Sequence, residues 1–275
     1  MQTFNWQGHR GARGLVPENS IPAFLKALEY EVTTLELDVA VSKDHKIIVS
    51  HEPWFSSVIA SHPNGEAVTK DEEYDLKLID MDYATIKSYD CGQRAHPRFP
   101  EQELMQVHKP SLEDVVNAVK KYCALKDKPL PYWNIEIKSH PMGDTIFHPL
   151  PANFAELLVK ELQDWGIYSK TTIQSFDIRP LKYLRNKHPK IALALLVENQ
   201  DGHEKNLQKL GFIPEIYSCY HKFLDKNVVD SLHQKGMQVI PWTVNEVTRM
   251  DTLIEMGVDG IITDYPNRIE AVSKQ

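Results

Sequence analysis

Cysteines are scarce in this chain. Its 275 residues contain three, Cys91, Cys123 and Cys219, at wide spacing and without a Cys-x-x-Cys pair. An odd number in this arrangement excludes a disulfide framework. We therefore expect three isolated thiols in or near the hydrophobic core.

Long apolar runs are also missing. No segment of about 18 consecutive apolar residues occurs, which excludes a membrane-spanning helix and predicts no stable insertion into a membrane. No basic N-terminal region precedes an apolar one, so no signal peptide is visible. These absences favour a cytoplasmic protein, although an exported chain whose signal peptide has been removed would look the same.

A basic stripe is the third absence. The formal net charge is −7, and the Lys and Arg residues are scattered among acidic ones. Nucleic-acid-binding proteins usually carry such a stripe, so we expect no nucleic acid as a partner. An acidic chain that handles an anionic substrate must concentrate positive charge locally, through Lys, Arg or a bound cation.

The chain does contain a regular alternation of strand-like and helix-like segments, which is typical of parallel βαβ units. Eight of these strands are predicted at residues 4–9, 33–41, 132–138, 171–175, 191–197, 215–218, 237–242 and 260–263. Eight parallel strands with helices between them predict a closed (β/α)8 barrel of the TIM type. The length suits a single such domain, spanning residues 1–275.

One region departs from this alternation. Residues 46–50 form an additional strand after 33–41, and a hairpin turn centred on Asp44 and His45 would place Asp38 opposite His51. Residues from about 52 to 110 then carry scattered Pro, His and charged residues with little periodicity. We interpret them as an insertion that lies over one end of the barrel.

Several helix starts are marked by capping residues. The candidates are Asn19 and Ser20 before Pro22, Ser111 with Asp114, and Asn153. Oxygens of such side chains accept hydrogen bonds from the free N–H groups of a first helical turn, so each predicts where a helix begins.

Residues suited to proton transfer and phosphate binding stand near strand ends. His9 and Arg10 follow the first strand between two glycines, and His51 with Glu52 follows an apolar run. Histidine exchanges a proton near neutral pH, and arginine presents a planar fork that matches a phosphate. Alone, a His-Arg pair is typical of surface structure.

Carboxylates alternate with apolar residues in two strands. Glu36 and Asp38 share one face of residues 33–41, and Glu136 shares a face with Lys138. Buried neighbouring carboxylates repel, and a hard cation resolves that conflict. A polar strand face explains an isolated pair equally well. Together, two histidines, three carboxylates, an arginine and a lysine near strand ends favour a catalytic site, because barrel enzymes place their sites there.

The order of several motifs resembles that of the glycerophosphodiester phosphodiesterase family, over nearly the whole chain. The matching segments are His9-Arg10-Gly11, Pro17-Glu18-Asn19-Ser20, Phe24, Leu35-Glu36-Leu37-Asp38, Ser42-Lys43-Asp44, Val49-Ser50-His51-Glu52, Ile135-Glu136-Ile137-Lys138, Gln174-Ser175-Phe176-Asp177, Pro241-Trp242-Thr243-Val244-Asn245 and the run from Gly257 to Pro266. The chain departs from the family at Glu31 and Glu52, where members often have Gly and Asp.

The resemblance implies a barrel with a small inserted subdomain and assigns roles to eight residues. It implies that Glu36, Asp38 and Glu136 hold a divalent cation, which oxygen ligands identify as Mg²⁺ or Ca²⁺. The remaining assignments are acid–base catalysis by His9 and His51, phosphate binding by Arg10 and Lys138, and packing beside the substrate by Trp242. Ordinary core packing is an equal interpretation of Trp242.

The expected function is metal-dependent hydrolysis of a small-molecule glycerophosphodiester to glycerol 3-phosphate and an alcohol, by general acid/base catalysis. The alternative is a phospholipase that acts on lysophospholipid or sphingomyelin-type lipids with the same site. An inactive binding protein is disfavoured because every expected group is present, and a sugar hydrolase because Arg10 and the histidines suit phosphate better. The alcohol headgroup, the role of each histidine, a cyclic phosphate intermediate and the oligomeric state stay open.

Overall fold

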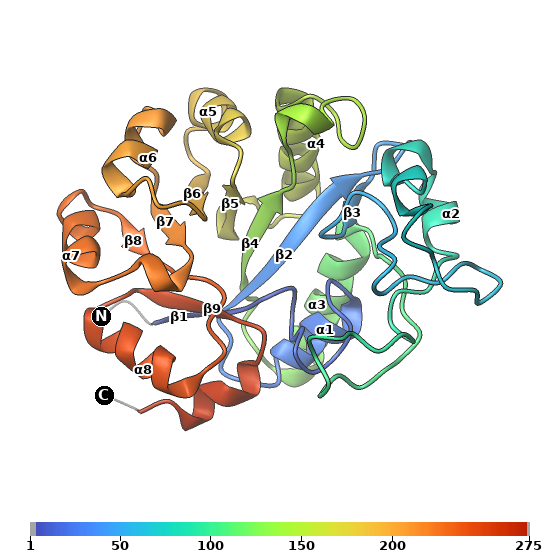
Figure 1. Cartoon of the computed structure of the whole chain (residues 1–275), viewed down its shortest axis with the longest axis horizontal. Coiled ribbons are helices and arrows are strands. Elements are labelled where there is room, and N and C mark those ends of the chain that lie inside the picture. The colour runs from blue at the N-terminus through green and yellow to red at the C-terminus, as the bar shows by residue number, and fades with distance from the viewer. Residues whose placement is uncertain (1–3, 274–275) are drawn as a thin grey trace.

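A ring of parallel strands forms the centre of the molecule. The computed structural model describes residues 4–273, and within them eight parallel strands pair in the order β8-β7-β6-β5-β4-β2-β1-β9 (Figure 1). They are β1 (Asn5–Gly8), β2 (Thr34–Val41), β4 (Tyr132–Ile137), β5 (Thr171–Ser175), β6 (Ala192–Val197), β7 (Ile216–Cys219), β8 (Gln238–Val239) and β9 (Gly260–Thr263). Backbone hydrogen bonds from Asp259 N to Val239 O (2.9 Å) and from Ile262 N to Pro241 O (3.0 Å) link the two ends. The ring is nearly closed, and the predicted (β/α)8 barrel is confirmed.

Helices surround this ring (Figure 1). The α-helices are α1 (Ile21–Ala27), α2 (Tyr83–Ile86), α3 (Leu112–Lys126), α4 (Pro151–Asp164), α5 (Ile178–Lys187), α6 (His203–Leu210), α7 (Lys226–Gln234) and α8 (Val247–Met256). Short 3-10 helices are η1 (Glu73–Asp75), η2 (Leu78–Asp80), η3 (Pro141–Gly143), η4 (Tyr168–Lys170), η5 (His221–Phe223) and η6 (Pro266–Ala271). Within residues 4–273, no helix has the length and apolar character needed to cross a membrane.

Strand β2 shows how charged residues come to face the inside of the ring. All of its residues are buried. Leu35, Leu37 and Val39 belong to the main apolar cluster, together with residues of the surrounding helices. Successive side chains of a strand point to opposite faces, so Glu36 and Asp38 point inward.

Two predicted helix starts are confirmed. Ser20 caps α1 and Ser111 caps α3, each side-chain oxygen accepting a hydrogen bond from a backbone N–H of the first turn. The predicted cap at Asn153 was wrong, because α4 already begins at Pro151, whose fixed φ suits the first helical position. The three cysteines are buried and free of disulfide bonds, as predicted.

Strand β3 (Ile47–Val49) pairs antiparallel with β2 and forms the predicted hairpin. Its register centres the turn on Asp44 alone, and Ser50 N donates a hydrogen bond to Asp38 O at 2.9 Å. Ser50 therefore lies opposite Asp38, and the predicted pairing of Asp38 with His51 was wrong by one residue. The turn contains an odd number of residues, whereas the prediction assumed an even number.

The insertion (residues 52–110) packs against the outer side of this hairpin. It has its own cluster of buried apolar side chains, among them Phe55, Leu78 and Ile86, which also includes Ala40 of β2 and Ile48 of β3. Figure 1 shows this segment, in cyan to green around α2, beside β3. That the chain is one domain carrying an insertion remains our interpretation.

Candidate active site

The predicted site residues gather toward the carboxyl ends of the barrel strands, within β2 and β4 or just after β1, where a cavity of about 530 Å³ opens. Seven of the eight line it: His9, Arg10, Glu36, His51, Glu136, Lys138 and Trp242. The eighth, Asp38, is almost fully buried and lies 3.1 Å from Arg10 Nε and 3.8 Å from Lys138 Nζ. The structure thus brings all eight together.

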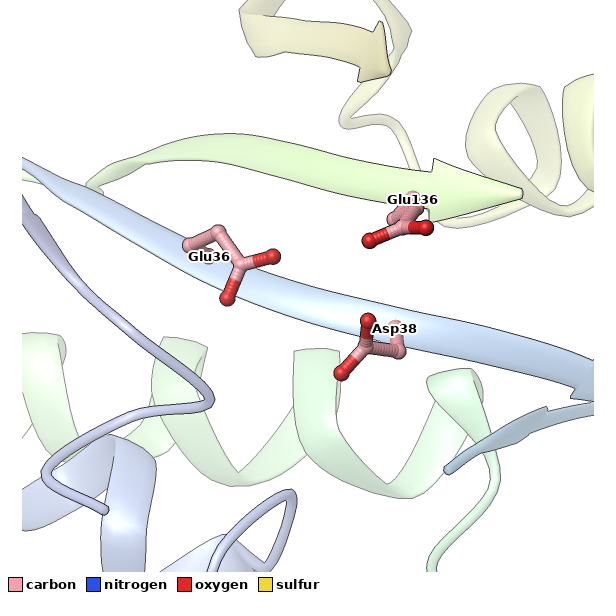
Figure 2. Close-up of side chains that lie close together, drawn as sticks. All are labelled: Glu36, Asp38 and Glu136. Atoms are coloured by element: carbon pink, nitrogen blue, oxygen red, sulfur yellow. The ribbon is translucent and has the colours of Figure 1, made fainter. Parts of the chain in front are cut away.

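Three carboxylates form the negative part of this site. Figure 2 shows Glu36 and Asp38 on β2 and Glu136 on the neighbouring β4, where Asp38 and Glu136 are direct register partners. One oxygen from each lies within 4.8 Å of the others, and all three residues are buried. Further hydrogen bonds orient them: Gln174 Nε2 donates to Glu36 Oε1 at 2.8 Å, and Asn19 Nδ2 donates to Asp38 Oδ2 at 2.9 Å.

The protonation of these carboxylates is strongly perturbed. Burial and the neighbouring Asp38 raise the pKa of Glu36 well above its ordinary value. Burial raises the pKa of Glu136 to about 7, although Lys138 opposes the change. Asp38 differs: burial opposes its ionisation, but the charges of Arg10, His51 and Lys138 together outweigh burial and hold the pKa of that carboxyl well below its usual range. The positively charged side chains therefore offset the negative charge of Asp38, but they do not fully offset that of Glu36 or Glu136.

This donor set fits a hard divalent cation. Oxygen ligands at such spacing suit Mg²⁺ or Ca²⁺, and a bound cation would favour the ionised forms of Glu36 and Glu136. Among the described residues, no other group of three His, Cys, Asp or Glu side chains meets this spacing. The structure therefore supports these three as candidate ligands.

Arg10 is held by an unusual backbone turn. Its φ is +50° and that of Gly11 is +84°, and a Cβ on Gly11 would lie 2.5 Å from a backbone atom of α1. In this turn Arg10 N donates to Glu36 Oε2 at 2.9 Å, and Nη1 donates to Glu18 Oε1 at 2.6 Å. Burial opposes the guanidinium charge, but Glu18 and Asp38 outweigh it and raise the pKa of Arg10. The guanidinium of Arg10 is thus fixed in place and permanently charged.

Lys138 and two aromatic rings line the cavity beside the carboxylates. Lys138 Nζ lies 2.9 Å from Glu136 Oε1, and its pKa is raised because Glu136 and Asp38 outweigh burial. The rings of Phe176 and Trp242 meet edge to face at 5.5 Å. Trp242 is partly buried, lines the cavity and donates its indole N–H to a backbone carbonyl. This position suits both packing beside the substrate and ordinary core packing.

His9 is oriented by a carboxylate from the opposite end of the chain. Its Nδ1 lies 2.6 Å from Asp264 Oδ1, directly after β9, which pairs with β1. Asn245 Nδ2 donates to Asp264 Oδ2 at 2.8 Å and fixes that carboxylate. Burial lowers the pKa of His9 although Asp264 acts in the opposite direction. The arrangement leaves Nε2 directed toward Glu36, at 3.9 Å from Oε2.

His51 has a corresponding partner in the next residue. Its Nδ1 lies 2.7 Å from Glu52 Oε1, and both side chains are more exposed than the His9 pair, at 30% and 27%. Burial and the charge of Arg10 lower the pKa of His51. Burial opposes the ionisation of Glu52, but the hydrogen bond and charge of His51, together with the charges of Arg10 and Lys109, outweigh it and lower the pKa of Glu52. Both histidines therefore use Nδ1 for a carboxylate, and within the described residues neither Nε2 forms a hydrogen bond.

We predicted no role in the site for several residues that support it. They are Glu18, Asn19, Glu52, Gln174, Asn245 and Asp264. All six lie in the motifs that carry the family resemblance, which was the available signal. Their partners became visible only with the strand register and the loop contacts.

Comparisons with known proteins identify a family for this chain. The model of the glycerophosphoryl diester phosphodiesterase family matches residues 9–268. A glycerophosphodiester phosphodiesterase from Caldanaerobacter subterraneus subsp. tengcongensis is 28% identical over 263 residues, which cover 95% of this chain and 94% of that protein. A lysophospholipase D of Rattus norvegicus is 24% identical and covers 95% of this chain and 83% of its own length.

Solved structures show the same fold. A crystal structure of a protein from Silicibacter pomeroyi DSS-3 has a TM-score of 0.86 and 26% identity, and covers 98% of this chain and 93% of that one. An Oleispira antarctica phosphodiesterase, solved with its product sn-glycerol-3-phosphate, has a TM-score of 0.73 and 18% identity, with 97% and 95% covered. At this lower identity the likeness concerns the fold alone.

Proposed function

Because this chain belongs to the glycerophosphoryl diester phosphodiesterase family, a family of phosphodiester hydrolases, we propose that it hydrolyses glycerophosphodiesters to glycerol 3-phosphate and an alcohol. The observation that carries the proposal is the joint presence of His9 and His51, each with a carboxylate on Nδ1, around the three clustered carboxylates. The product named for the Oleispira antarctica phosphodiesterase is consistent with this reaction.

In this proposal Glu36, Asp38 and Glu136 hold a divalent cation, Mg²⁺ or Ca²⁺. When bound, the cation would offset negative charge on the non-bridging phosphate oxygens and stabilise the charge that develops during attack. Arg10 and Lys138 would bind the same phosphate, since both hold fixed positive charge at the cavity. In the structure Arg10 and Lys138 are paired with the carboxylates of Asp38 and Glu136. A metal ion bound to these carboxylates would in part release the two basic side chains for the phosphate.

The two histidines would move the protons. A carboxylate on Nδ1 favours the tautomer with hydrogen on that atom, so Nε2 of His9 and of His51 is available toward the substrate. One takes a proton from the nucleophile and the other gives a proton to the leaving alcohol. Because one must be neutral and the other protonated, activity is expected to pass through a maximum with pH.

Release of glycerol 3-phosphate from glycerophosphocholine tests both parts of the proposal. The purified protein would be assayed with Mg²⁺, with Ca²⁺ and with EDTA. The activity of Glu136→Gln would be measured in parallel over a range of cation concentrations. We expect release with at least one cation, loss in EDTA and a higher cation requirement for the variant. If neither cation supports release, the proposed substrate is wrong. If release is complete after full chelation, the proposed metal site is wrong.

A phospholipase acting on lysophospholipid or sphingomyelin-type lipids is the second candidate. One specific observation favours it: a second cavity with a largely apolar wall adjoins the site, with Trp54, Phe147 and Phe176 among its lining residues. The distant lysophospholipase D relative is compatible with this candidate. Lipid and glycerophosphocholine hydrolysis measured side by side distinguish the two.

A further inference from the structure

Lys109 is a buried lysine at the end of the insertion, and it is only 5% exposed. Its Nζ donates a hydrogen bond to Ser50 Oγ at 2.6 Å and lies 5.5 Å from the centre of the Phe55 ring. Among residues 4–273, no carboxylate forms an ion pair with it. A buried charge without an ion pair costs stability, so a lysine in this position indicates a role in function rather than in folding.

The backbone places Lys109 beside the segment that carries His51. Val49 N, at the end of β3, donates a hydrogen bond to Pro110 O at 2.8 Å. The chain therefore returns from the insertion alongside the end of β3, and Lys109 contacts Ser50, the residue directly before His51.

The hydroxyl of Ser50 connects Lys109 to the residue on the other side of His51. Ser50 Oγ donates its one hydrogen to Glu52 O at 2.5 Å and accepts the hydrogen bond from Lys109. Against the effect of burial, the charge of Lys109 also acts with His51 and Arg10 to lower the pKa of Glu52. The residues before and after His51 are thus both held by the contact with Lys109.

We propose that Lys109 is a positioning residue for the hydrolysis, and that it acts through Ser50 to hold His51 in place for proton transfer. This inference rests on the proposed function. Within the described part of the chain, Lys109 is not among the residues that line either cavity, so it would not bind the substrate. Its loss should displace His51 and slow the chemical step while leaving substrate binding nearly unchanged.

Lys109→Met tests this inference, because methionine has a similar length but carries no charge and no N–H donor. With the cation that best supports the wild-type protein, kcat for glycerophosphocholine should fall about tenfold, and KM should change less than about twofold. The variant should unfold at the same or a higher temperature, since it removes a buried charge that has no ion pair. A residue needed only for folding would lower the unfolding temperature instead.

Lys87→Met is the matched control. Lys87 also belongs to the insertion and lies over an aromatic ring, at 5.4 Å from the centre of Tyr83, but its side chain is exposed. This variant makes the same change of side chain away from Ser50 and should leave kcat unaltered.

Ser50→Ala tests the route from Lys109 to His51. If Lys109 acts through Ser50, the double variant should lose about tenfold in kcat, like each single variant, and not the roughly 100-fold expected of independent effects. Combined with Asp264→Asn, which concerns His9, the loss caused by Lys109→Met should multiply in full.

Four results would each overturn the inference. They are an unchanged kcat in Lys109→Met, an equal loss in Lys87→Met, a loss of kcat that comes with a lower unfolding temperature, and losses that multiply between Lys109→Met and Ser50→Ala. In a wild-type protein that hydrolyses glycerophosphocholine, these results remove only this inference. No hydrolysis of any diester by the wild-type protein would remove the proposed function as well.

Discussion

The two histidines of the site depend on different parts of the molecule. His9 and Asp264 are brought together by the pairing of the first and last strands, and their side chains are 13% and 1% exposed. His51 and Glu52 are neighbours in sequence where the hairpin meets the insertion, and theirs are 30% and 27% exposed. One pair belongs to the closed barrel, and the other belongs to an outer loop that water can reach.

The same contact, a carboxylate on Nδ1 of a histidine, thus has unequal structural support at the two positions. Asp264 is fixed by Asn245 through two hydrogen bonds, one to its carboxylate and one from its backbone N–H. For Glu52 the described residues supply one side-chain hydrogen bond, to His51. Loss of the buried partner leaves His9 unsatisfied, whereas water can replace the exposed one.

The largest expected effect comes from removing either histidine. His9→Ala and His51→Ala should each lower kcat for glycerophosphocholine by about 10²–10⁴, since each removes a proton-transfer group. Initial rates at saturating substrate give kcat, and circular dichroism checks folding. A variant that keeps near-full activity would show that its histidine has been misassigned.

Changing the carboxylates that bind Nδ1 of the two histidines tests whether His9 is better supported than His51. Asp264→Asn should reduce kcat by about 100-fold, because an amide in that position can donate to Nδ1 and favour the wrong tautomer. Glu52→Gln should cost about tenfold, since solvent can restore the hydrogen bond to His51. Steady-state kinetics of both variants decide the order, and a larger loss for Glu52→Gln would reverse our view of which histidine is better supported.

The smallest effect concerns the support of the strand that leads to His51. Glu161 of α4 accepts a hydrogen bond from Ile47 N of β3 at 3.0 Å, and burial raises its pKa from 4.5 to about 7. A carboxyl with a raised pKa contributes stability that is full below its unfolded value and is lost as pH rises through the folded value.

Glu161→Gln keeps the accepting oxygen and removes the buried charge. It should raise the free energy of unfolding by about 1–3 kcal/mol at about pH 8, and by less at about pH 5. Denaturant unfolding at both pH values measures this, with Glu113→Gln as a more exposed control. A stabilisation that does not depend on pH would contradict the buried-charge explanation.

The barrel and the carboxylate cluster were predictable because both follow from local pattern. Alternation along β2 places Glu36 and Asp38 on one face, and the eight-strand count then implies closure. The register of the hairpin was not predictable, because a turn centred on one residue or between two residues fits the same letters. That ambiguity misplaced His51 by one position.

Partners contributed by distant segments were also beyond the sequence alone. Asp264 reaches His9 because Gly8 pairs with Thr263, a register that only barrel closure determines. Glu18 reaches Arg10 because Arg10 adopts a positive φ, which residue type does not predict. The family resemblance marked these positions as parts of motifs, but the contacts that give them roles are tertiary.

The union of β1 with β9 also bears on how the protein is made. During synthesis Asp264 follows His9 by 255 residues. At about 5–20 residues per second, that interval is on the order of 10–50 seconds. A nascent or prematurely terminated chain can already contain Arg10 and the clustered carboxylates, yet it lacks the carboxylate that orients His9. Activity measured in cells would therefore come from chains that extend at least to Asp264.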